Sequence, residues 1–165
     1  MTSGTDAARP VTVMGVGNPI MGDDGVGLEL LKAVEAACPD ARIEYVDGGT
    51  GGMELIPTVQ DAHRLLILDA VAGPTPGAVV EIVGDQLPRL LSTKVSPHQV
   101  GLRDVFAAAR LLGREPAEAM VVGIVPQSIE LRVGLSGVVT AALPEATGRA
   151  CAVLNRWLGG AADAS

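Results

Sequence analysis

Residues 64–69 read RLLILD, and this stretch decides the fold class. The apolar run from Leu65 to Leu68 is unbroken and ends at the acidic residue Asp69. A strand with one exposed face alternates polar and apolar residues, whereas a strand covered on both faces reads as a continuous apolar run. We therefore predict that Arg64–Leu68 is a central strand of a sheet with helices on both faces.

Four more strands are predicted before and after this one. The stretch Arg42–Asp47 alternates apolar and polar residues, which is typical of a strand with one exposed face, so we expect it at an edge of the sheet. Ala119–Val125 is another continuous apolar run and favours a buried strand. The remaining two predicted strands are Val11–Val16 and Ala78–Val83.

Helical segments separate these strands. Apolar residues at helical spacing follow the glycine-rich turn after the first strand, at Val26, Leu30, Leu31 and Val34. Pro39 ends this helix. Gly101–Leu112 forms a second helix that stops at Gly113, and Ser136–Leu158 forms a long final helix that Pro144 is expected to bend. The alternation predicts an α/β fold, a three-layer α/β/α sandwich around a mainly parallel (mixed) twisted sheet of about five strands.

The 165 residues are expected to form one domain. We assign it to residues 10–158, because the small, polar segments 1–9 and 159–165 show no periodic pattern and are interpreted as flexible tails. The formal net charge of −7 and the lack of a Lys/Arg run argue against nucleic-acid partners, whose phosphates bind cationic side chains. No apolar run approaches the roughly 20 residues that span a bilayer, so we expect no membrane insertion.

The two cysteines, Cys38 and Cys151, lie far apart in the sequence, and neither belongs to a CxxC pair. Lone cysteines of this kind indicate neither a disulfide framework nor a structural zinc site. A reducing compartment fits this pattern best, and we expect a cytoplasmic protein.

Three aspartates are expected at one edge of the sheet. Open α/β sheets bind ligands beyond the carboxyl ends of their strands. Asp24 follows the first strand, Asp47 ends the second and Asp69 ends the third, so topology brings all three carboxylates to the same edge. Asp69 closes a buried strand, where a charge without a partner is costly, and it must face a cation or several donors.

The other aspartates have structural interpretations. Asp23 precedes a helix and is interpreted as its N-cap, while Asp24 fits capping and ligand binding about equally well. Asp47 is followed by two glycines and is interpreted first as a turn former.

His98 is the histidine that we select as a candidate ligand. It follows Pro97 in a short loop before a helix, whereas His63 is interpreted as a solvated loop residue. Two carboxylates and one imidazole, from Asp24, Asp69 and His98, would form a three-ligand site with room for water or substrate, unlike closed structural zinc sites. Imidazole suits nickel as well as zinc.

Two other chemistries receive less weight. Ser96 and His98 could form a nucleophile and a base, but their spacing matches no recognised serine-enzyme arrangement and G-x-S-x-G is absent. Gly15 and Gly17 after the first strand are typical of dinucleotide-binding turns, but the third glycine position is occupied by Ile20. A nucleotide-binding α/β enzyme is therefore a weak alternative.

Five stretches of the chain form an ordered set of motifs that covers nearly the whole expected domain. They are GVGNPIMGDDGVG (15–27), DGGTGGMEL (47–55), LILDAV (66–71), KVSPHQVGL (94–102) and VGIVPQSIELRVGLS (122–136). With these motifs the chain resembles the endopeptidases that mature the large subunit of nickel-iron hydrogenases.

The resemblance implies an enzyme that cuts a short C-terminal tail from the large-subunit precursor after nickel insertion. The family's metal-contacting positions fall on Asp24, Asp69 and His98, and the metal is the precursor's own nickel, so no organic cofactor is expected. Asp47 would orient the peptide or a water, and a carboxylate or a metal-bound water would supply the hydrolytic step. We expect a monomer. A non-catalytic, metal-checking chaperone of the precursor stays an alternative, because no residue is an unmistakable nucleophile.

Overall fold

The computed structural model describes residues 10–50, 52–83 and 102–163. Its sheet has five strands in the order β2-β1-β3-β5-β4, all parallel to their neighbours except β4, which runs antiparallel to β5. This confirms the mainly parallel, mixed sheet predicted from the sequence. The strand bounds are β1 Val11–Gly15, β2 Ile43–Asp47, β3 Arg64–Ala70, β4 Val79–Val83 and β5 Glu118–Ile124.

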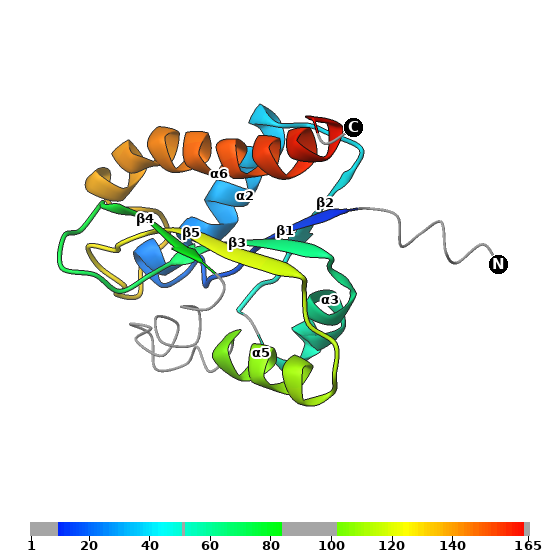
Figure 1. The fold of residues 1–165 in the computed structure, drawn as a ribbon. Coiled ribbons are helices and arrows are strands. Elements are labelled where there is room, and N and C mark those ends of the chain that lie inside the picture. The colour runs from blue at the N-terminus through cyan, green and yellow to red at the C-terminus, as the bar shows by residue number, and fades with distance from the viewer. Residues whose placement is uncertain (1–9, 51, 84–101, 164–165) are drawn as a thin grey trace.

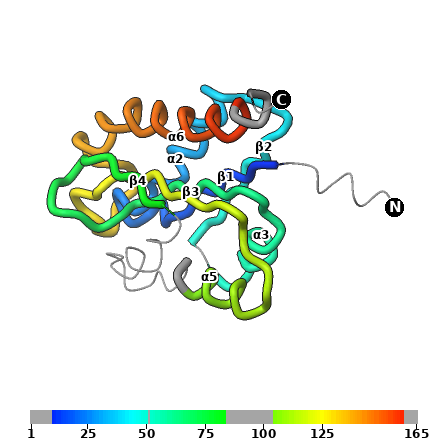
Figure 2. Tube along the Cα trace, in the orientation of Figure 1, coloured from blue at the N-terminus to red at the C-terminus, as the bar shows by residue number. Residues whose placement is uncertain are grey.

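Helices cover both faces of the sheet. Helices α2 and α6 pack together on one face, and α3 and α5 pack together on the other (Figures 1 and 2). The three-layer α/β/α arrangement is thereby confirmed. The helix bounds are α2 Val26–Ala37, α3 Ile56–Asp61, α5 Leu102–Leu111 and α6 Gly137–Asp163, with the short 3-10 helices η1 Gly22–Gly25 and η2 Met53–Leu55 before α2 and α3.

Strand β3 is the middle of the sheet, as its apolar run predicts. Residues 65–70 are all buried between β1 and β5. Side chains alternate along a strand, so Leu66 and Leu68 join the core under α2 and α6, while Leu65 and Ile67 join the core under α3 and α5. The strand predicted at an edge, β2, does lie at an edge, with Ile43 buried and Glu44 exposed.

The structure differs from the sequence expectations at two helices. Helix α3 was not predicted, because six residues that include Pro57 are too few to show a helical period. Helix α6 continues through Asp163, five residues beyond the predicted end at Leu158, so residues 159–163, which the sequence assigned to a C-terminal tail, are helical. Pro144 lies inside α6. The predicted tail at residues 1–9 lies outside the described residues.

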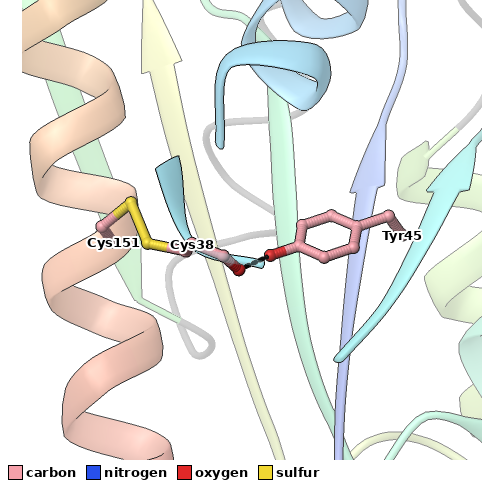
Figure 3. Close-up of a disulfide and its surroundings, with 3 residues drawn as sticks. All are labelled: Cys38, Tyr45 and Cys151. Carbon is pink, nitrogen blue, oxygen red and sulfur yellow. Dashed lines mark hydrogen bonds between the residues drawn. A yellow bond between two sulfur atoms is a disulfide. The ribbon is translucent and has the colours of Figure 1, made fainter. Parts of the chain in front are cut away.

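The structure corrects the interpretation of the two cysteines. Cys38 follows α2 and forms a disulfide bond with Cys151 on α6, over a sequence separation of 113 residues (Figure 3). The Tyr45 hydroxyl donates a hydrogen bond to the Cys38 carbonyl beside it (Figure 3). Packing of α2 against α6 creates the pair, and no local sequence pattern reveals such packing. The sequence argument for a reducing compartment is therefore lost, and a cytoplasmic location stays a prediction.

The disulfide is expected to contribute strongly to stability. Replacing both partners (Cys38→Ser with Cys151→Ser) should lower the free energy of unfolding by about 2–5 kcal/mol, because the bond closes a long loop in the unfolded chain. Urea unfolding followed by circular dichroism measures this loss. Reduced wild-type protein should unfold at the same urea concentration as the double variant, and an unfolding midpoint that does not respond to reduction would contradict the expectation.

Within the described part of the chain, no helix combines the length and apolarity that crossing a bilayer requires.

Candidate functional site

The candidate site lies at the carboxyl edge of β1, β2 and β3. In the sheet register, Gly15 at the end of β1 is level with Asp47 on β2 and with Leu68 on β3. Asp69 follows one residue later, and Asp24 lies in η1, which is the next element after β1 and packs against β3. The structure therefore brings the three predicted aspartates to one edge of the sheet.

Two glycines let η1 and α2 approach the strand ends. The Val16 amide donates a 3.0 Å hydrogen bond to the Leu68 carbonyl, and a Cβ atom at Gly27 would collide with the carbonyl oxygens of both residues. Gly17 has φ +150°, and a Cβ there would collide with the Asp24 carbonyl oxygen. Because these two glycines have no side chain, the backbone segments can pack closely, and this packing holds Asp24 next to the end of β3.

Asp24 and Asp69 are both fully buried. One oxygen of Asp24, Oδ2, accepts a 3.1 Å hydrogen bond from the Asn18 amide, and Oδ1 of Asp69 accepts a 2.8 Å bond from the Ala70 amide. Buried carboxylates are paired with donors or coordinate metals, because an ionised group loses its hydration on burial. Two buried carboxylates at the edge where open α/β sheets bind ligands have the chemistry to contact a cation.

The third predicted ligand, His98, lies outside the described residues, as does Ser96. Within the ranges that the structure describes, no group of three or more His, Cys, Asp or Glu side chains could hold a metal ion. His63, just before β3, is exposed as expected. The ligand set of Asp24, Asp69 and His98 therefore stays a prediction.

Asp47 does not lie beside Asp69. The register places Asp47 on the sheet face of Leu68, whereas Asp69 follows Leu68 and faces the other side. The two strands are separated by β1, which corresponds to about 10 Å across the sheet. Asp47 is exposed, and its Oδ1 accepts a 2.8 Å bond from the amide of Gly49, whose φ is +56°. This geometry supports the turn-forming interpretation, and a catalytic role for Asp47 stays a prediction.

Asp23 has a different role from the predicted one. Neither η1 nor α2 has a side-chain N-cap, so the N-cap interpretation of Asp23 was wrong. Its fully buried carboxylate reaches the segment between β5 and α6. Oδ1 accepts a 2.6 Å bond from the Ser136 amide, and Oδ2 accepts bonds from the Ser136 hydroxyl, the Gln127 amide and the Ser128 amide at 2.8, 2.9 and 3.1 Å.

We call this arrangement the Asp23 clamp, meaning the Asp23 carboxylate with its partners Gln127, Ser128 and Ser136. Burial, the largest single influence, raises the pKa of Asp23, but the hydrogen bonds together outweigh it. The pKa of Asp23 therefore lies below its usual value of 3.8, and the residue is ionised at neutral pH. The clamp fixes the segment 127–136 next to Asp24.

Sequence reasoning missed this clamp because its partners are 104 to 113 residues from Asp23. The motif at 122–136 was part of the resemblance, but no residue in it carries a pattern that predicts a chemical role.

Comparison with known proteins agrees with this fold. The family model for hydrogenase maturation proteases matches residues 28–153. The Hydrogenase 2 maturation protease of Escherichia coli (strain K12) is 36% identical over 88% of this chain and 90% of its own length. The hydrogenase expression/formation protein HoxM of Cupriavidus necator is 35% identical over 90% of this chain and 76% of its own length.

Solved structures give the same result. The hydrogenase maturating endopeptidase HybD from E. coli superimposes with a TM-score of 0.81 at 34% identity, covering 88% of this chain and 92% of that one. The [NiFe] hydrogenase maturation protease HybD from Thermococcus kodakarensis superimposes with a TM-score of 0.70 at 27% identity, covering 87% and 97%. The chain therefore belongs to the hydrogenase maturation protease family and is a peptide-bond hydrolase.

Proposed function

We propose that this protein removes the C-terminal extension of a nickel-iron hydrogenase large-subunit precursor after nickel has been inserted. The observation that carries the proposal is the pair of fully buried carboxylates, Asp24 and Asp69, at the ligand-binding edge of the sheet in a hydrogenase maturation protease. The substrate class follows from the names of the relatives, which are proteases of hydrogenases.

In this proposal the nickel belongs to the precursor and is recognised as part of the substrate. Asp24, Asp69 and His98 would contact it, and three ligands leave coordination positions for the groups that hold nickel in the precursor. Contact with the metal fixes the scissile bond beside the carboxylates, so hydrolysis gains the advantage of a reaction between oriented groups. A precursor without nickel lacks this anchor, so it should keep its tail.

The proposal predicts that cleavage depends on nickel in the precursor. Purified protein is mixed with nickel-loaded and with nickel-free precursor, and the mass of each precursor is followed over time. We expect the tail to be lost from the loaded precursor alone. Equal cleavage of both forms would overturn nickel recognition, although the protease activity would stand.

The same experiment tests the alternative of a metal-checking chaperone. Stable binding of the loaded precursor with no change in its mass would favour that alternative and overturn the proposed cleavage. Sedimentation of the free protein tests the further proposal that it acts as a monomer.

A further inference from the structure

We propose that Ile20, Leu131 and Val133 form a docking surface for an apolar segment of the precursor near its scissile bond. We call these three residues the apolar ledge. This inference rests on the proposed function and extends it, because it assigns a substrate-binding surface outside the carboxylates that would read the metal.

The ledge is exposed although its side chains are apolar. Ile20 is 51% exposed, Leu131 77% and Val133 80%. Single exposed apolar residues are common on proteins, but apolar groups gathered in one place mark interaction sites, because covering them removes apolar surface from water.

Backbone pairing gathers the three residues. The Arg132 amide donates a 2.9 Å bond to the Ile20 carbonyl, and the Arg132 carbonyl accepts a 2.8 Å bond from the Gly22 amide. Met21 and Arg132 form an isolated parallel bridge. In this parallel register Ile20 lies level with Leu131, and Leu131 and Val133, two residues apart, share a face, so the backbone places the three residues in one region from positions more than a hundred residues apart.

The ledge is continuous with the candidate site. Asn18 connects them, because its side-chain oxygen accepts a 3.2 Å bond from the Ile20 amide while its own amide donates to the Asp24 carboxylate. The Met21 carbonyl accepts a 3.1 Å bond from the Asp24 amide. Ile20 therefore lies on the short loop that contacts Asp24 through Asn18 and Met21, and a polypeptide bound at the candidate site would pass close to it.

The surface is also held in place before any partner arrives. The Asp23 clamp binds the amides of Gln127 and Ser128, and the Ser128 hydroxyl accepts a 3.3 Å bond from the Glu130 amide. Preorganised surfaces bind more tightly, because less conformational entropy is lost on binding. The occupant that these features select is the substrate polypeptide at the site of cutting.

The test uses the double variant Leu131→Asp with Val133→Asp and purified nickel-loaded precursor. Two carboxylates on the ledge should raise KM for tail removal by about tenfold or more, because apolar burial is replaced by burial of charge. The kcat should change by less than about twofold, since the ledge contributes to binding and not to chemistry. A second double variant, Leu131→Met with Val133→Ile, keeps the ledge apolar and should have a KM close to the wild-type value.

The chain offers a matched control. Leu111 and Leu112 are exposed apolar residues, 87% and 63%. Leu111 is the last residue of α5 and Leu112 follows it, on the connection that leads to the start of β5 at the opposite edge of the sheet. Replacing both by Asp should leave KM at the wild-type value.

Each outcome distinguishes the inference from the proposed function. An unchanged KM for the ledge variant, with normal cutting by wild type, would overturn the ledge alone. Failure of wild type to cut the loaded precursor would overturn the proposed function. A change in the oligomeric state of the ledge variant with an unchanged KM would assign the ledge to a second copy of the chain and overturn precursor docking. Thermal melting followed by circular dichroism checks that the ledge variant and the apolar Met and Ile variant are both folded.

Discussion

The Asp69→Asn variant is expected to leave the C-terminal tail of the nickel-loaded precursor uncut, with a rate at least about 100-fold below wild type. At metal sites, the loss of a residue that only hydrogen-bonds to a metal ligand lowers affinity or activity by about 10–100-fold, and the loss of a ligand itself should lower the rate at least as much. Asn has the shape of Asp and can keep the hydrogen bond from the Ala70 amide, so the fold should be retained. The mass of the precursor over time measures the rate.

Three further substitutions test which residues act together with Asp69. Asp24→Asn and His98→Ala should have the same effect as Asp69→Asn if the three residues act together, and His98→Ala tests the one ligand that rests on the motif alone. Asp47→Asn distinguishes the two interpretations of Asp47: if Asp47 only forms the turn, this variant cuts normally, because an Asn oxygen can still accept the bond from Gly49 and keep the turn. Normal cutting by Asp69→Asn would remove the carboxylate pair from the mechanism, and slow cutting by Asp47→Asn would give Asp47 a catalytic role.

Asp23→Ala is expected to cost about 3–5 kcal/mol of unfolding free energy, which is a large part of a typical total of about 5–15 kcal/mol. The loss is large because four donors, three backbone amides and the Ser136 hydroxyl, lose their acceptor in a buried place. Urea unfolding at neutral pH measures it. Asp61→Ala is the matched control, since Asp61 is an exposed partner of Arg114, and it should cost less than about 1 kcal/mol.

The contribution of Asp23 should depend on pH in a defined direction. Its pKa is lowered in the folded protein, so its stabilisation is fully present above the usual value of 3.8 and is lost as the pH falls through the folded pKa. Asp40, whose pKa is lowered to about 2 by Arg42, contributes acid sensitivity to both proteins and cancels in the comparison. The stability difference between wild type and Asp23→Asn should therefore shrink below about pH 4. A difference that stays constant down to pH 2 would contradict the role of the ionised carboxylate.

Much of the fold could be predicted because hydrophobic pattern reports how each strand is covered. The unbroken run in β3 indicated burial on both faces, and the alternation in β2 indicated an edge. The direction of β4 could not be predicted, because it depends on which neighbour the strand meets, and β4 pairs with β5 and not with β3, which precedes it in the chain.

The candidate site, like the fold, could be predicted from the sequence only in part. Topology alone brought Asp24, Asp47 and Asp69 to one edge, since the carboxyl ends of parallel strands meet there. Only the register separated Asp47 from Asp69 by placing them on opposite faces, because side-chain direction changes with every residue along a strand.

By itself, the sequence determined the α/β class, the central strand, the family motifs and the edge where the aspartates meet, because these depend on local pattern and on chain order. Tertiary structure alone decided the Cys38–Cys151 bond, the Asp23 clamp and the apolar ledge. Each of these joins residues about a hundred positions apart, and such pairs are set by how α2, α6 and the strand ends pack, which no local spacing records.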